Sequence, residues 1–284
     1  MPRPSKIEVS AINLRIPSDR SRNYAELINR ILNLRRGVRI HGENYVALTE
    51  FNESTGVGVF SKYSEIDLDK DWFDIEDFGT ATPESLSEIR IPEHLKPNLS
   101  AFYFELDESL HVVAFETYSD SKSLSGRSVE KYFREVLTDP EILSEFGRVE
   151  ADLVKDYGKV EQLLALPQLK SLEIVIRLPN PIDISGSLAE RIEERLREQN
   201  AEEYREELKS KDEDGLQPNE RTRQLAFVAA ENGDVVARSL VNGVITTQVT
   251  DENPLKEVDT YNSETASSQQ VFKRLATRIL QRIR

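Results

Sequence analysis

The sequence predicts an α+β protein of two domains, with mostly antiparallel sheets and flanking helices. Three observations point to this class. Pairs of alternating, aromatic or β-branched segments are joined by short polar turns, as in β-hairpins. Segments with apolar residues at helical spacing lie between these pairs, an order that favours antiparallel sheets over a parallel α/β sheet. The length of 284 residues allows one large domain or two modest ones.

The first expected domain covers residues 1–147. Its first helix is predicted because the apolar residues from Tyr24 to Leu32 recur at three- and four-residue spacing and form one face. The elements expected in order are a strand over 6–15, a helix over 21–36, a hairpin of 44–51 with 56–63, irregular chain over 65–78, a short helix from Thr82, a hairpin of 100–106 with 111–115, and helices near 128–137 and 140–146.

The second expected domain covers residues 148–284 and contains a three-strand meander and a terminal helix. Asn232-Gly233 and Asn242-Gly243 are strong short hairpin signals and predict the corners of the meander. The elements expected in order are a short helix over 160–166, a strand over 170–178, a helix that starts at the capping box from Ser187 and runs into a charged stretch, strands over 223–230, 234–241 and 244–250, and a helix over 263–283.

Composition excludes several classes of protein. The chain has no cysteine, which rules out disulfide frameworks, thiolate catalysis and cysteine-ligated metal sites. The formal net charge of −14 rules out a surface that is basic throughout. The start of the chain shows no signal peptide, and no apolar run approaches the roughly 20 residues of a membrane helix, so we expect a cytoplasmic protein without direct membrane insertion.

Catalytic motifs are scarce, and we therefore expect a non-enzymatic protein without a cofactor or metal. No phosphate-binding glycine loop or nucleophile elbow occurs, and the three histidines lie far apart in the sequence. An alternative is a metal-dependent nuclease, because Glu116, Asp120 and Lys122 follow a predicted strand and have the residue types that such a site uses.

Positive charge is concentrated at the two ends of the chain. The first 40 residues contain nine basic and three acidic residues, a net charge of +6, so the remaining 244 residues carry −20. In the last helix, Arg274, Arg278 and Arg282 recur every four residues and form a stripe beside the apolar one. This pattern predicts that both chain ends place guanidinium groups on a common side of an otherwise anionic body.

Ten of these cations are the candidate DNA-binding residues. Arginine forks suit phosphate oxygens, and each neutralised phosphate releases counterions without any reading of the base sequence. The alternatives are that cations complement helix dipoles or pair with some of the surplus carboxylates. The candidates are Arg20, Arg22, Arg30, Arg35, Arg36, Arg39, Lys273, Arg274, Arg278 and Arg282.

An acidic stretch over residues 65–78 interleaves seven carboxylates with Trp72, Phe73 and Phe78. Such a stretch is either a solvated loop, a cover for the basic face, or a docking surface for a basic partner with Trp72 as its anchor.

The order of elements resembles the RexA family, the cytosolic component of the phage lambda superinfection-exclusion system, and related bacterial defence proteins. The resemblance is spread over most of the chain rather than concentrated in one signature. The segments that carry it are NYAELINRILNLRRGVRIHGENYVALTEFNESTGVGVFSK, LSAFYFELDESLHVVAFETYSDSKSLSG, LKSLEIVIRL, QLAFVAAENGDVVARSL and VFKRLATRIL.

This resemblance implies a homodimer of two-domain chains that binds double-stranded DNA with little sequence preference. It also implies that there is no catalytic site, and that the protein senses phage replication and activates a partner, which is a membrane or toxin effector encoded nearby. The strong acidity of this chain departs from that expectation.

Overall fold

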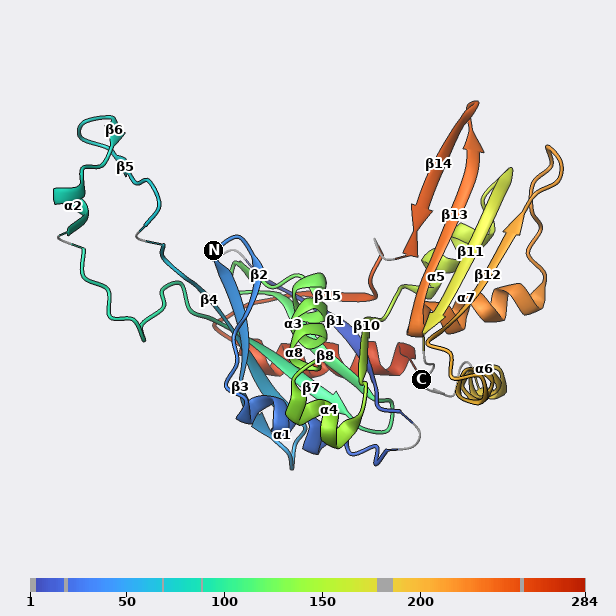
Figure 1. Ribbon diagram of the computed structural model, residues 1–284, viewed down its shortest axis with the longest axis horizontal. Helices are drawn as coiled ribbons and strands as arrows, with labels where there is room; N and C mark the ends of the chain where they lie inside the picture. Colours follow the sequence, from blue (N-terminus) through green and yellow to red (C-terminus); the bar gives the residue numbers. More distant parts are fainter. Residues whose placement is uncertain are drawn as a thin grey trace.

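The computed structural model describes residues 4–17, 20–67, 69–87, 89–177, 186–250 and 253–283. Its α+β class is the one that the sequence predicts, and every strand pair in these ranges is antiparallel. Figure 1 shows a central sheet, an arm that projects from one end of it, and a second sheet that rises at the other end, so that the outline resembles a U.

The central sheet has nine strands and the order β10-β1-β8-β7-β4-β3-β2, while β15 pairs with β1 and β9 pairs with β8. Both hairpins predicted in the first half are confirmed, since Tyr45 pairs with Tyr63 and Phe104 with Phe115. The strands are β1 (Ser5–Arg15), β2 (Val38–His41), β3 (Asn44–Asn52), β4 (Val57–Ser64), β7 (Ser100–Asp107), β8 (Val112–Ser119), β9 (Lys122–Ser123), β10 (Glu150–Leu153) and β15 (Lys256–Tyr261).

Helices cover both faces of this sheet. One face packs against α1 (Tyr24–Asn33), α3 (Gly126–Val136) and α4 (Pro140–Phe146), and the other packs against α8 (Ser268–Ile283). Strand β1 serves both layers because successive side chains alternate: Ile12 belongs to the first core and Ala11 to the second.

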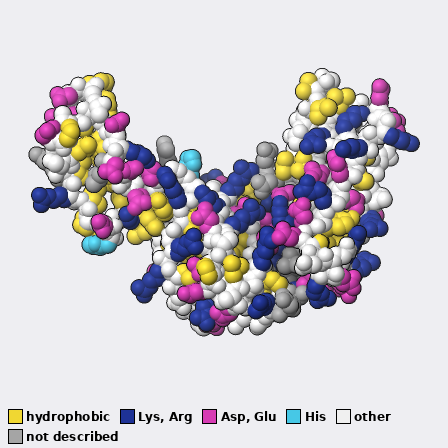
Figure 2. Space-filling model, viewed as in Figure 1, with side chains coloured by type: hydrophobic (Ala, Val, Ile, Leu, Met, Phe, Trp, Pro, Cys, Tyr) yellow, Lys and Arg dark blue, Asp and Glu magenta, His cyan; other side chains and the backbone are white. Residues whose placement is uncertain are grey.

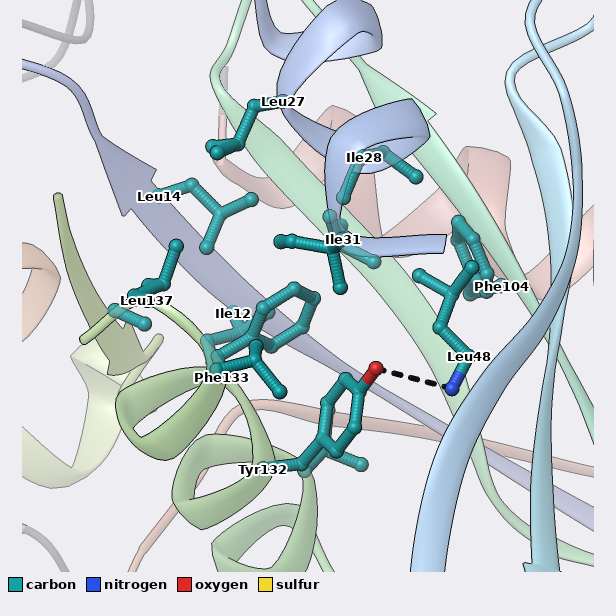
Figure 3. Packing of buried hydrophobic residues seen from close by; sticks show 14 of the residues in the cluster. Ile12, Leu14, Leu27, Ile28, Ile31, Leu48, Phe104, Tyr132, Phe133 and Leu137 are labelled. Carbon is teal, nitrogen blue, oxygen red and sulfur yellow. Dashed lines mark hydrogen bonds between the residues drawn. The ribbon is translucent and has the colours of Figure 1, made fainter. Parts of the chain in front are cut away.

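Figure 3 shows the first of these cores. Apolar side chains of α1 and of α3 meet above the sheet, which is the face that the helical spacing from Tyr24 onward predicts. The Tyr132 hydroxyl of α3 accepts a hydrogen bond of 3.0 Å from the Leu48 N–H of β3, so its one polar atom is satisfied inside the core. The Asn23 side chain caps α1 by accepting a bond of 2.9 Å from the Glu26 N–H.

The second sheet has the order β12-β11-β13-β14 and a separate core. Three helices pack on one of its faces and on one another, with α7 in contact with both of the others. The elements are β11 (Leu169–Arg177), β12 (Glu203–Lys209), β13 (Gly233–Val241), β14 (Val244–Val249), α5 (Tyr157–Leu164), α6 (Gly186–Glu198) and α7 (Glu220–Asn232).

Two sequence predictions in this region are wrong. Residues 223–230 form part of helix α7 and not the first strand of a meander, because Asn219 caps the segment and its run of alanine, leucine and valine is buried against two helices and the sheet. The charged residues 203–209 form the edge strand β12 and not a helix, because the less exposed residues Tyr204, Glu206 and Leu208 alternate with exposed ones at a spacing of two. The hairpin at Asn242-Gly243 is confirmed by the pairing of β13 with β14.

The chain does not divide between the two sheets at residue 147. It leaves the central sheet after β10, builds the second sheet, and returns through β15 and α8 to complete the central one. The predicted unit of meander plus terminal helix is therefore not formed, since the terminal helix packs on β1, β7, β8 and β15. The reason is that the apolar stripe of α8 fits the second face of the central sheet, which no other helix covers in the described ranges.

The arm, residues 65–97, is inserted between two adjacent strands. Its base is narrow, because Lys62 of β4 pairs with Ser100 of β7 and the Ser64 N–H donates a bond of 2.9 Å to the Pro97 carbonyl. Beyond that base are a two-stranded sheet of β5 (Phe73–Asp74) and β6 (Gly79–Thr80) and the short helix α2 (Pro83–Ser87). The sequence predicted irregular chain for the part up to residue 78. None of the three hydrophobic cores includes a buried residue from the described part of the arm.

Candidate nucleic-acid interface

The ten candidate cations do not share a face. Arg30 lies in α1 and Arg274, Arg278 and Arg282 lie in α8, and these two helices pack on opposite faces of the central sheet. The prediction that both chain ends present guanidinium groups on a common side is therefore wrong. Each helix has its own apolar stripe, and a two-sided sheet separates the two stripes.

Most of these cations are also paired with carboxylates where they lie. The surplus acid that the composition shows is the source of these partners. The N···O distances are 2.9 Å for Arg22–Glu193, 2.9 Å for Arg30–Glu145, 3.7 Å for Arg36–Asp139, 2.8 Å for Arg39–Glu43, 2.7 Å for Arg274–Asp259, 3.7 Å for Arg278–Asp259 and 2.8 Å for Arg282–Glu257.

The remaining three candidates lie apart from one another. Arg20 packs next to Gly147, Arg35 follows α1 with a left-handed φ of 47°, and Lys273 is exposed on α8. The original set of ten thus provides no continuous phosphate-binding surface.

A different group of cations does gather in one place, and we name it the floor cluster: Lys6, Lys62, Lys122, Arg127 and Lys256. Arg127 and Lys256 line one open cleft of about 520 Å³ together with Ser123 and Tyr118. The Lys62 ammonium donates a bond of 2.9 Å to the Ser123 carbonyl, and the Lys6 ammonium lies 5.4 Å from the centre of the Tyr118 ring.

The floor cluster occupies the middle of the U. The cleft is bounded by β1, β8, β9, β10, β15 and the N-terminus of α3. Figure 1 shows β1, β10, β15 and α3 between the arm and the second sheet. Figure 2 shows Lys and Arg side chains over this part of the molecule. One carboxylate, that of Glu8, lines the same cleft and pairs with Lys6 at 2.6 Å.

Two lysines of the floor cluster bond to uncharged oxygen atoms. Lys62 bonds to a backbone carbonyl, as does Lys122, which donates 3.1 Å to the Leu99 oxygen. A carbonyl neutralises no charge, in contrast to the carboxylates that hold the α8 arginines. These two bonds therefore leave the positive charge of both ammonium groups in place, and that of Lys62 lies beside Ser123 of the cleft wall.

Of the residues of the nuclease alternative, Glu116 and Asp120 lie close enough to interact electrostatically, whereas the Lys122 ammonium bonds to a backbone carbonyl. Glu116 is buried and accepts a bond of 2.9 Å from the Tyr103 N–H, whereas Asp120 is exposed and accepts a bond of 3.4 Å from the Tyr261 hydroxyl. The Lys122 ammonium donates its hydrogen bond to the Leu99 carbonyl. Within the part of the chain that the structure describes, no three carboxylate or imidazole groups gather as metal ligands do.

Burial raises the pKa of Glu116 from 4.5 to about 7. Between these two pH values the carboxyl is therefore protonated in the folded state and ionised in the unfolded chain. Folding stability should therefore fall as pH rises from about 4.5 to 7, by about 3 kcal/mol from this group. In Glu116→Gln this part of the pH dependence should be absent when the free energy of unfolding is measured by urea denaturation between pH 4.5 and 8. The exposed Glu84→Gln should keep the wild-type profile, and a Glu116→Gln profile parallel to wild type would contradict the assignment.

A buried ionic network joins the two sheets. Asp152 of β10 bonds to Arg15 of β1, to Arg134 of α3 at 2.8 Å and to Arg177 of β11 at 3.3 Å. Arg177 also bonds to Asp234 of β13 at 2.9 Å. These guanidinium groups hold the pKa of Asp152 well below its usual range in spite of its burial.

The tip of the arm exposes large apolar side chains among carboxylates. Phe73, Ile75 and Phe78 are 61%, 78% and 82% exposed. The carboxylates beside them, those of Asp71, Glu76 and Asp77, are exposed as well. Figure 2 shows hydrophobic side chains in yellow and acidic side chains in magenta at the tip of the arm. Trp72, the anchor that the sequence suggested, is half-buried and donates a bond of 3.3 Å to the Asp67 carbonyl, so the phenylalanines are the exposed aromatic residues.

Fold and site together define an α+β protein with an arm, a cationic cleft and an inserted second sheet. The chain matches the family described as "Domain of unknown function (DUF4747)" over residues 5–277, and it belongs to that family. A search of curated proteins finds no match to the sequence. No helix in the described ranges combines the length and the apolar character that crossing a membrane requires.

Proposed function

We propose that this protein binds double-stranded DNA without sequence preference through the floor cluster. The observation that carries the proposal is that Arg127 and Lys256 line one open cleft while Lys62 and Lys6 contact its lining residues Ser123 and Tyr118. Lys122 is the neighbour of Ser123 in the chain, and among the described lining residues Glu8 is the one carboxylate. Lysine and arginine contacts to phosphate supply affinity that does not depend on base sequence.

The acidic remainder of the molecule supports the same proposal. A body that carries an overall charge of −14 repels a polyanion from most of its surface, so DNA contact is restricted to the cationic cleft. Five cations per chain are few for a stable complex, and a homodimer would double their number across a duplex. The homodimer, a role in phage exclusion or defence, and activation of a partner effector rest on the resemblance to the RexA family and are part of this proposal.

The proposal is tested by fluorescence anisotropy with labelled duplexes of equal length and unrelated sequence at low salt. We expect dissociation constants that agree within a few-fold among the duplexes and a sedimentation coefficient that corresponds to a dimer on DNA. The absence of binding at low salt, or a strong preference for one sequence, would contradict it.

A second candidate function is that of an adaptor that docks a basic partner protein on the arm. It is favoured by the three exposed apolar side chains and the carboxylates around them, because a contiguous apolar patch with a charged rim is typical of an interaction surface. That the described residues of the arm contribute nothing to the three cores also suits a segment whose purpose lies outside the fold.

Trp72 is the only tryptophan of the chain, and its emission therefore reports on the arm alone. A basic amphipathic peptide of lysine and leucine should change this emission saturably, and the double variant Phe73→Ser, Phe78→Ser should weaken binding about ten-fold or more, because apolar anchors carry most of such affinity. The matched control is Leu143→Ser, an exposed apolar residue of α4. An emission change that is equal in both variants, or that an acidic peptide of glutamate and leucine also causes, would contradict docking on the arm.

A further inference from the structure

A second cationic pocket lies in the inserted unit, away from the floor cluster. It has a volume of about 370 Å³ and lies between the helices α6 and α7 and the edge strand β12 of the second sheet. Arg191 and Arg195 of α6 and Arg221 of α7 line it, and none of its described lining residues is a carboxylate. The other lining residues are Leu188, Ile192, Tyr204, Gln224 and Leu225.

The three arginines bring like charges to one small pocket. Arg191 and Arg195 lie four residues apart on one helix, where like charges repel, and Arg221 faces the same space from the neighbouring helix. Burial raises the pKa of the Tyr204 hydroxyl, and the positive charges of Arg195 and Arg221 act in the opposite direction with a smaller effect. The same hydroxyl donates a bond of 2.7 Å to the Glu206 carboxylate.

The pocket also offers planar and apolar surfaces. The Arg195 guanidinium lies 5.5 Å from the centre of the Tyr204 ring, so a cation and an aromatic face stand side by side at its wall. Ile192 and Leu225 are buried and provide an apolar floor. The Gln224 amide donates to Glu220 at 3.3 Å, which leaves its carbonyl oxygen as an acceptor at the rim.

We propose that this pocket binds a nucleoside phosphate. Guanidinium forks match phosphate oxygens in geometry and in charge, and the apolar floor with the Tyr204 ring suits a planar base. The volume is within the range of about 300–1,000 Å³ that is usual for small-molecule sites. A simple anion would use the three arginines but leave the aromatic and apolar walls without a function, which favours a ligand that has both parts.

This inference does not depend on DNA binding by the floor cluster, because the two sites share no residue. The test is isothermal titration calorimetry of the full-length protein with ATP and GTP, with inorganic triphosphate and adenosine as partial ligands. We expect at least one nucleotide to bind more tightly than either partial ligand. Arg221→Gln should weaken that binding about ten-fold or more, as the loss of a charge-assisted hydrogen bond does.

Matched variants separate this site from general charge effects. Arg197→Gln removes the same charge from α6 at a position that does not line the pocket, and it should leave nucleotide affinity within two-fold, on the order of experimental error. Arg195→Lys keeps the charge but loses the planar fork, so it should weaken binding while the melting temperature stays at the wild-type value. The inference is overturned if neither nucleotide binds, if inorganic triphosphate binds as tightly as ATP and GTP, or if Arg197→Gln weakens binding as much as Arg221→Gln.

Discussion

Replacing Asp152 by alanine should lower the free energy of unfolding by about 3–5 kcal/mol, the usual cost of removing one partner from a buried ion pair. Arg15, which is 1% exposed, would keep its charge in the interior without its main counter-ion. Arg134 and Arg177 would each lose a bond to the same carboxylate. Since Arg177 belongs to the second sheet, the variant should also loosen the contact between the two sheets.

Urea denaturation of Asp152→Ala and of Asp259→Ala provides the comparison. Asp259 binds Arg274 at 2.7 Å at a more exposed position, where an ion pair contributes about 0–1 kcal/mol. The low pKa of Asp152 in the folded state means that its contribution is complete above the ordinary carboxyl range and is lost as pH falls below about 4. Equal losses in the two variants at neutral pH would show that the network does not hold the sheets together.

The triple variant Lys62→Glu, Lys122→Glu, Lys256→Glu should bind duplex DNA about 100-fold more weakly at low salt, because it removes three phosphate contacts and adds three repulsive charges. The matched control carries the same three substitutions at Lys159, Lys211 and Lys273, which are exposed and do not belong to the floor cluster. Both variants change the net charge equally, so only the position of the charge differs.

The control variant should bind DNA within a few-fold of wild type. If it lost as much affinity as the floor variant, attraction would follow net charge and the floor cluster would not be the interface. Circular dichroism and the melting temperature of each variant establish that the fold is retained.

Local patterns in the sequence predicted local structure well. The hairpins of β3 with β4 and of β7 with β8, and the helices α1 and α8, follow from turn residues and apolar spacing over a few residues. The two wrong elements arose where one pattern fits two structures. The apolar run of α7 is buried on most sides and so has no clear period, and the charges of β12 concealed a spacing of two residues.

The candidate site could not be predicted in the same way, because it depends on long-range topology. Lys6 and Lys256 lie on neighbouring strands only because β15 pairs with β1 after the chain has built a second sheet, with Lys256 opposite Ser10. In the sequence each is a single lysine with no pattern around it. The arginines formed an obvious pattern, but the structure distributes them over two faces and pairs most of them with acids that are distant in the sequence, such as Glu145 for Arg30.

The most direct measurement is the salt dependence of DNA binding by the wild type and by the neutral variant Lys62→Gln, Lys122→Gln, Lys256→Gln. The logarithm of the association constant should fall linearly with the logarithm of salt concentration, and the slope of the variant should be smaller in magnitude by roughly 2.7, about 0.9 for each lost phosphate contact. Equal slopes for the two proteins would mean that these lysines meet no phosphate, and would contradict the floor cluster as the DNA-binding surface.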